Sequence, residues 1–408
     1  MRRTLAFAAG DYGGLTVLID CALRATPADR ICRGVVRTGL ARAASTLAAA
    51  CALMLAAACT SQGQEFTNSF ALARPFPIGG NDVAAANSAN YALFGLGNRY
   101  LELLGNQGGP SWQANLFGTG ANPNGGGAPA APEPPRYRVW TELYGLTANT
   151  GAQPFFPGDA RKTYGGVAGF AMNVTSNATV GISVDQSKTR IDITGLPQHA
   201  TLDLTQVGLN GAYEWGKWTF SGAAVYGFGN VDQSRETTFF GPALADYRAR
   251  LWGTIGEASY YIPLGSARIV PKFGGDWTQT HTDGYSEVGG ALEAVTVPDA
   301  MANRGRIFAG AEVGNTWING SSVIDLSAYA KGVDILFQRV PNLAVSAVAF
   351  GATPVTVFGV QESKYGIDTG AMVSMRLSPL ARIYAVYDGK FRDGFQSNSG
   401  TLGLEFRW

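Results

Sequence analysis

Two histidines, His199 and His281, are the side chains whose type is best suited to catalysis. In a hydrolase, a histidine acts as general base beside a serine nucleophile, and a carboxylate orients the histidine. Asp203 follows His199 by four residues and Asp283 follows His281 by two, but the sequence places no serine convincingly beside either histidine. We therefore expect both histidines to lie in solvated loops, and we assign no catalytic residue. A hydrolase remains one hypothesis, which unchanged lipase and protease assays after His199→Ala and His281→Ala would remove.

Metal and cofactor sites are not indicated by the remaining residues. Two histidines without a spacing motif do not define a metal site. The four cysteines, Cys21, Cys32, Cys51 and Cys59, all lie within the first 59 residues. The rest of the chain therefore has neither structural disulfides nor a thiolate metal site. We predict no metal and no cofactor.

The charge of the chain excludes a nucleic-acid footprint. The formal net charge is +1, but the first 42 residues contain seven Arg and three Asp. The remaining residues carry 24 basic and 27 acidic side chains, so no basic patch is expected. Glycine is abundant, with 54 residues, and charged residues make up only 15% of the chain. This mixture is typical of many strands with tight turns.

The elements that position these side chains are strands, which begin at Arg136. In residues 218–229, Trp218, Phe220 and Tyr226 share one face, while Thr219 and Ser221 share the other. Such alternation predicts strands with one apolar face, and a tilted strand of about ten residues crosses a bilayer. Twelve candidate strands follow this pattern: 136–148, 163–174, 179–186, 204–215, 218–229, 247–262, 267–279, 305–317, 322–332, 364–377, 381–391 and 400–408.

The connections between the candidate strands alternate in length. Those after even-numbered strands are short, whereas most of those after odd-numbered strands are long: 149–162, 187–203, 230–246, 280–304 and 333–363. Short periplasmic turns and long extracellular loops are the rule for outer-membrane barrels. Charged strand residues, such as Glu142, Glu257, Lys272 and Glu312, are expected to face the lumen. We predict an all-β fold, a twelve-stranded antiparallel outer-membrane β-barrel.

The last predicted strand also alternates between an apolar and a polar face, as a strand of a closed barrel does. Leu402, Leu404, Phe406 and Trp408 share one face of residues 399–408, and polar or small residues share the other. An unpaired amphipathic edge of this kind invites aggregation in water. In a closed barrel the last strand pairs with the first, and its apolar face meets lipid.

The first 58 residues are predicted to be a signal region. Arg37 and Arg42 precede the apolar run Ala43–Ala58, the pattern of a secretory signal. The true start is expected near Val35 or Val36, and cleavage near Ala58. The run before Cys59 also resembles a lipoprotein box, so lipidation of Cys59 is the alternative to ordinary cleavage.

Residues 59–135 are predicted to be a short exported segment. Its middle, residues 82–104, is a candidate helix that Asp82 caps and Gly105 ends. A helix of this length spans roughly 33 Å, enough to cross a membrane inside a barrel. The alternative is a frayed surface segment. Residues 106–135 form a Gly/Pro-rich linker, and residues 136–408 form the barrel.

Four motifs carry a resemblance to a known family: Val139–Gly145, Gly208–Trp218, Tyr387–Phe391 and Gly400–Trp408. Together they resemble the translocator β-domain of type V autotransporters. The resemblance implies a helix in the bore, an outer membrane of a Gram-negative bacterium, and outer-membrane lipid, the barrel-assembly machinery and periplasmic chaperones as partners. It also implies that the N-terminal segment is translocated through the pore and anchored at the cell surface. By position, Leu402, Leu404, Phe406 and Trp408 would form the barrel-assembly signal.

The chain departs from that family in two ways, which leave an alternative function open. Residues 60–135 contain no repeated β-helix pattern, so the passenger is expected to be absent or very short. A long linker also separates the candidate helix from the first strand. The alternative is a stand-alone barrel that acts as an adhesin or narrow porin through loops 280–304 and 333–363. A conductance unaffected by deleting residues 60–135 would favour the pore.

Overall fold

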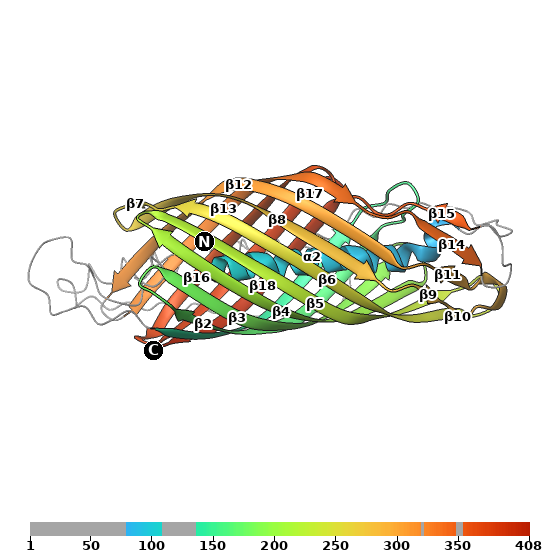
Figure 1. Cartoon of the computed structure of the whole chain (residues 1–408), viewed down its shortest axis with the longest axis horizontal. Coiled ribbons are helices and arrows are strands. Elements are labelled where there is room, and N and C mark those ends of the chain that lie inside the picture. Colours follow the sequence, from blue (N-terminus) through green and yellow to red (C-terminus); the bar gives the residue numbers. More distant parts are fainter. Residues whose placement is uncertain (1–78, 108–135, 320–321, 348–353) are drawn as a thin grey trace, which may run out of the picture. The chain divides into compact units, whose positions relative to one another are not determined.

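A closed antiparallel barrel forms the body of the computed structural model, which describes residues 79–107, 136–319, 322–347 and 354–408 (Figure 1). Strand β1 pairs with β18, and β6 pairs with β8, so the sheet closes on itself. The predicted all-β, twelve-stranded fold is therefore confirmed. The barrel strands are β1 Tyr137–Thr150, β2 Asp159–Asn173, β3 Ala178–Ile193, β4 Gln198–Trp215, β5 Trp218–Glu236, β6 Pro242–Tyr260, β8 Ala267–Thr282, β12 Ala300–Asn319, β13 Ser322–Arg339, β16 Tyr365–Ser378, β17 Ala381–Arg392 and β18 Phe395–Arg407.

The two ends of the barrel differ. One end, here called the terminal end, holds Tyr137, Trp408 and the tight turns 174–177, 216–217, 265–266 and 379–380. Gly216 and Gly265 have φ of 62° and 68°, a conformation that favours glycine in two-residue turns. The opposite end, here called the loop end, holds residues 151–158, 194–197, 237–241, 283–299 and 393–394, and the described parts of the 340–364 connection, 340–347 and 354–364.

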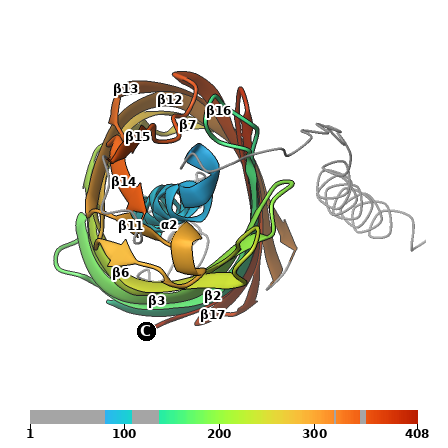
Figure 2. The same ribbon diagram turned by 90° about the vertical axis from the view of Figure 1, so that its right-hand side faces the viewer.

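Short elements in the two longest connections partly cover the loop end. Strands β9, β11, β14 and β15 form a separate four-stranded sheet, and β10 extends the barrel beside β6. In the view along the barrel axis, β11 and β14 lie in front of the ring of strands (Figure 2). The short elements of these connections are β9 Tyr285–Ser286, β10 Val288–Gly289, η2 Ala291–Glu293, β11 Val295–Val297, β14 Leu343–Ala347 and β15 Val355–Val357. A further short strand, β7 Ile262–Leu264, pairs with the start of β8 at the terminal end.

Most of the strands are longer than predicted, and the barrel strands have 12 to 20 residues each. The predicted loops 187–203 and 230–246 are largely strand, and only residues 194–197 and 237–241 connect them. The reason is that the pattern of side chains reverses at the loop end, where polar residues face outward and apolar residues face inward. Outward side chains such as Lys188 and Arg190 are exposed and charged there, whereas inward ones such as Ile191 and Leu202 are buried. Polar outward residues suit a strand that projects into water, so the sequence resembles a loop.

Helix α2, Ala84–Gln107, lies inside the ring of barrel strands (Figure 2). The short helix η1, Gly80–Val83, leads into it, and the backbone N–H of Gly79 donates a hydrogen bond to Asp82 over 2.8 Å. The predicted range was 82–104, so α2 begins two residues later and ends three residues later. Within the described ranges, no helix is both long and apolar enough to span a membrane. The predicted helix in the bore is confirmed.

Candidate functional site

Helix α2 packs against one side of the bore, where glycines on the barrel wall make room for it. The helix contacts β3, β4, β5, β6 and β8. A Cβ on Gly208 would lie 2.3 Å from Cδ1 of Leu104, and a Cβ on Gly253 would lie 2.7 Å from Cδ1 of Leu101. A larger residue at either position would require Leu104 or Leu101 to shift from its present place. The wall of the barrel is therefore shaped to receive α2.

Arg99 is the central cation of the helix and is buried in the bore. Its guanidinium lies 3.6 Å from the carboxylate of Asp185 and 4.0 Å from that of Glu142. The guanidinium carbon also lies 3.2 Å from the centroid of the Tyr144 ring. Tyr144 in turn donates its hydroxyl to Asp185 over 3.0 Å. A buried charge needs such partners, so Arg99 binds the helix to β1 and β3.

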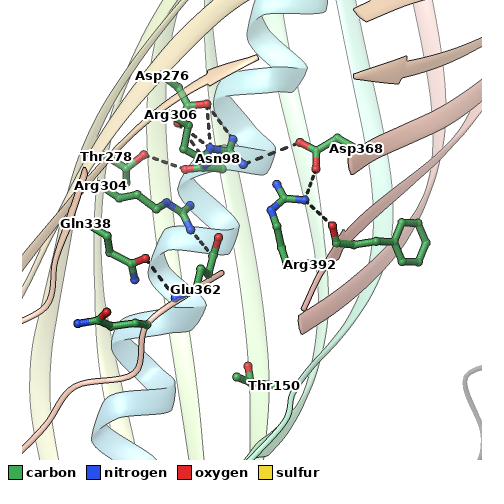
Figure 3. A network of polar contacts seen from close by, with 12 residues as sticks. Asn98, Thr150, Asp276, Thr278, Arg304, Arg306, Gln338, Glu362, Asp368 and Arg392 are labelled. Carbon is green, nitrogen blue, oxygen red and sulfur yellow. Dashed lines mark hydrogen bonds and ion pairs between the residues drawn. The ribbon is translucent and has the colours of Figure 1, made fainter. Parts of the chain in front are cut away.

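The two residues that flank Arg99 in the helix bind the wall on both sides of it, Asn98 at β8 and Tyr100 at β3. The side-chain amide of Asn98 donates a hydrogen bond to Asp276 over 3.3 Å and accepts one from Thr278 over 2.8 Å, both on β8 (Figure 3). The hydroxyl of Tyr100 lies 2.7 Å from that of Ser183 on β3. These contacts satisfy polar groups that the helix would otherwise bury unpaired.

Glu102 connects the helix to two further strands. Its carboxylate lies 2.8 Å from Nζ of Lys390 on β17 and 3.1 Å from Nη2 of Arg306 on β12. Arg306 also binds Asp276 over 2.8 Å and lies 3.8 Å from Asp368, as Figure 3 shows. Side chains of α2 thus make polar contacts with β1, β3, β8, β12 and β17, which lie on different sides of the helix.

The start of the helix is held at the loop end by Arg235 of β5. The Arg235 guanidinium lies 3.2 Å from the carboxylate of Asp82 and 2.6 Å from that of Glu287. It also donates a hydrogen bond to the backbone oxygen of Glu293 over 2.7 Å. In addition, the side chain of Gln198 donates a hydrogen bond to the backbone oxygen of Asn81 over 2.6 Å. One arginine therefore joins the helix start to the 283–299 connection.

Glu362 holds the other long connection in the loop-end mouth of the bore. It forms an ion pair with Arg304 of β12, and its backbone N–H donates a hydrogen bond to Gln338 over 3.1 Å (Figure 3). Burial would raise the pKa of the Glu362 carboxyl, but Arg304 and Arg392 outweigh it and lower the pKa to about 2. Glu362 is therefore ionised at neutral pH, and the 340–364 connection is bound electrostatically to the wall.

A cavity of about 150 Å³ remains between the helix and the other side of the bore. Helix residues Arg99 and Glu102 line it together with Lys331, Arg382 and Asp388 of the wall. Charges of both signs face this space, as expected in the lumen of an outer-membrane barrel, although most of its lining surface is apolar. Helix α2 occupies the bore beside this cavity (Figure 2) and is bound to the wall through Arg99 and Glu102, so it acts as a plug.

The lumen-facing charges that the sequence predicted lie as expected. Glu142 is buried beside Arg99, and Lys272 lies 3.0 Å from Glu312 and 3.7 Å from Glu257. Sequence reasoning missed Arg99, Glu102 and Arg306. A signal was present, because charged residues inside an otherwise apolar helix require buried partners.

The two histidines lie on strands, so their predicted placement in loops was wrong. His199 is near the start of β4, and His281 is near the end of β8. Nδ1 of His199 lies 2.8 Å from Asp192, and the His281 ring lies 3.5 Å from Asp283 and 3.8 Å from Asp299. Both histidines stand near the loop end, where the strands extend further than the sequence suggested. Among the described residues, no cluster of three or more His, Cys, Asp or Glu side chains is placed to hold a metal ion.

The predicted assembly-signal residues share the outward face of β18 and its end. Leu402, Phe406 and Trp408 are about half exposed, and Leu404 is partly exposed. The inward face of the same strand carries Glu405, which is fully buried and accepts a hydrogen bond from Arg382 over 2.9 Å. Their position fits contact with lipid or with an assembly factor, and their role stays a prediction.

Comparison with known proteins agrees with this architecture. The structure resembles the translocator domain of the autotransporter NalP from Neisseria meningitidis, with 14% sequence identity, a TM-score of 0.61, and coverage of 80% of this chain and 99% of that chain. It also resembles the β-domain of the Bordetella autotransporter Brka, with 15% identity, a TM-score of 0.50, and coverage of 67% and 100%. These likenesses show the fold.

No curated protein matches the sequence. The family model of the autotransporter β-domain, however, matches residues 139–388, which is more than half of the chain. The chain therefore belongs to the autotransporter β-domain family, whose members act in type V secretion.

Proposed function

We propose that this protein is an outer-membrane barrel of a Gram-negative bacterium that carries its own short N-terminal segment to the cell surface and holds it there. One observation carries the proposal: α2 runs along the bore with its start at the loop end and its end toward the terminal end. Arg235 binds Asp82 at the start of the helix. Leu104, near the other end of the helix, packs at Gly208 in the barrel wall. In this orientation Gly79, the first residue that the structure describes, lies at the loop end, which we assign to the cell exterior.

The mechanism uses geometry and pairing of charges and involves no bond chemistry. An extended N-terminal segment passes through the bore while the barrel forms in the membrane. Helix α2 then folds into its seat, and Arg99 and Glu102 acquire their wall partners. Because these pairs form only when the helix is seated, they make the final state stable and oppose return of the segment. We infer that no enzymatic step is needed.

Assembly of the barrel requires partners that recognise it before it closes. We propose that periplasmic chaperones and the barrel-assembly machinery bind the last strand through Leu402, Leu404, Phe406 and Trp408, and that the outer face then meets outer-membrane lipid. The outward apolar rows of β18 and its neighbours support this role, since they have no other apolar partner within the described fold.

An epitope tag inserted near Gly63 tests the display of the segment. In intact cells the tag is expected to bind antibody and to be removed by external protease. A tag in the Gly216–Lys217 turn, at the terminal end, serves as the protected control. Protection of the Gly63 tag until the outer membrane is opened would contradict the proposal.

A narrow porin is the alternative, and the seated helix argues against it. Planar-bilayer recordings separate the two functions. We expect little steady conductance from the full chain and a large increase when residues 80–107 are deleted. Equal conductance of the two proteins would support the pore.

A further inference from the structure

Two exposed aromatic rings lie together at the loop end. Phe155, in the 151–158 connection, and Phe358, in the 340–364 connection, have ring centroids 5.3 Å apart. Their exposed fractions are 60% and 49%. We call this pair the aromatic platform. Apolar surface held in water on two separate connections is unfavourable unless something covers it.

Two hydrogen bonds join the connections that carry the platform. Gln153 donates its side-chain amide to the backbone oxygen of Gln361 over 2.7 Å, and the backbone N–H of Gln361 donates to the side-chain oxygen of Gln153 over 3.2 Å. This reciprocal pair joins the two connections beside the rings. Phe155 itself has φ of 70°, a conformation that residues with side chains rarely adopt and that clusters at functional positions.

The chain enters the barrel directly beside this platform. Gly80 packs so closely on the backbone of Phe155 that a Cβ at Gly80 would lie 1.8 Å from the Phe155 carbonyl oxygen. The residues just before it include Phe76 and Ile78. Phe76 is four residues from Gly80, so its Cα lies within about 14 Å of that of Gly80 even if the chain is extended. These two apolar side chains therefore cannot be far from the platform.

We propose that the aromatic platform is the docking site for the chain's own residues 68–78, with Phe76 and Ile78 covering the rings of Phe155 and Phe358. The exported segment would then be bound back onto the connections instead of extending freely into the medium. This inference rests on the proposed function, because docking matters in the cell only if the segment is displayed. The docking itself can be measured on the purified protein.

Cysteine cross-linking tests the docking. In a Cys59→Ser background the exported chain has no other cysteine. Phe76→Cys is combined with Phe358→Cys in one protein and with Phe239→Cys in a matched control. Phe239 is a 70% exposed aromatic residue in the 237–241 connection at the same end. We expect the first pair to form an intramolecular disulfide at least about tenfold faster than the control, because docking raises the local concentration.

Equal rates for the two pairs, or no cross-link in either, would overturn the docking. Intermolecular dimers joined through the same cysteines would also overturn it, because the platform would then bind a second copy. Migration of every variant as a folded barrel in cold detergent confirms that the substitutions leave the fold intact. The experiment uses purified protein, so its failure is distinct from a failure of surface display, which is measured on intact cells.

Discussion

The carboxylate of Glu102 on α2 lies 2.8 Å from Nζ of Lys390 on β17. It also lies 3.1 Å from Arg306 on β12, a strand that β13 and β16 separate from β17 in the sheet. One helix side chain thus bridges distant parts of the wall. Because buried cations without a partner are costly, the helix cannot leave the bore without destabilising the wall around it.

Removing the Glu102 charge is therefore expected to weaken the seating of the helix. We predict that Glu102→Gln lowers the free energy of unfolding by roughly 3 kcal/mol, because Lys390 and Arg306 lose a buried counter-charge. Denaturant unfolding of the barrel in detergent measures the change. Glu236→Gln, at an exposed acidic residue on β5, serves as control and should change the value by less than about 0.5 kcal/mol. Equal effects of the two substitutions would contradict the role of Glu102.

Filling the helix seat is predicted to displace α2 while the barrel still folds. At Gly208→Val, the new side chain would overlap Leu104, which costs about 1 to 3 kcal/mol. Faster hydrogen exchange of the α2 amides reports the displacement. Gly256→Val is the matched control, because a Cβ there meets open space on the outer face of β6. Unchanged exchange in Gly208→Val would mean that the seat does not position the helix.

Arg235 is predicted to hold the loop-end connection closed over the helix start. Arg235→Gln leaves Glu287 buried without its cation, so the 283–299 connection should loosen, at a cost of roughly 3 kcal/mol. Limited proteolysis of this connection measures the effect. Arg190→Gln removes an exposed arginine whose side chain is 67% accessible and should leave the rate of cleavage unchanged. Matching cleavage rates in both variants would rule out the proposed role.

Stability is predicted to depend on pH through Glu362. Its pKa is about 2 in the folded state and near 4.5 in the unfolded chain, so the unfolded state binds the proton more tightly. Glu362 therefore contributes stability that is fully present above about pH 5.5 and is lost as pH falls from 4.5 toward 2. The expected contribution is about 3 kcal/mol.

The comparison of wild type with Glu362→Gln at two pH values measures this contribution. The variant should be less stable at pH 7, and the difference should shrink strongly at pH 2.5. A difference that is the same at both values would show that the ion pair with Arg304 does not hold the 340–364 connection.

The barrel could be predicted from the sequence because lipid imposes a simple rule on each strand. Outward positions such as Leu402 and Phe406 must be apolar, so every strand shows the same alternation, and Gly216 marks a turn. The rule fails where strands project beyond the apolar band. Lys188 and Arg190 face water there, and the sequence around them resembles a loop although it is strand.

The helix could be predicted from its apolar content, but its binding site could not. Arg99 finds Asp185 and Glu142, and Glu102 finds Lys390, only because the closed sheet brings distant strands around one axis. Such pairings depend on the register and on the side of the bore that the helix occupies. Neither the register nor the side of the bore is encoded in local periodicity, so the charges in the helix could indicate that partners exist but not which residues they are.

The most direct test of the account is labelling of single cysteines on intact cells with a membrane-impermeant maleimide. Three variants in a Cys59→Ser background suffice: Ser69→Cys in the N-terminal segment, Phe239→Cys at the loop end, and Lys217→Cys at the terminal end. We predict labelling at positions 69 and 239 and protection at position 217 until the outer membrane is opened. Labelling at 239 with protection at 69 would contradict the central claim, because the segment before α2 would then remain inside.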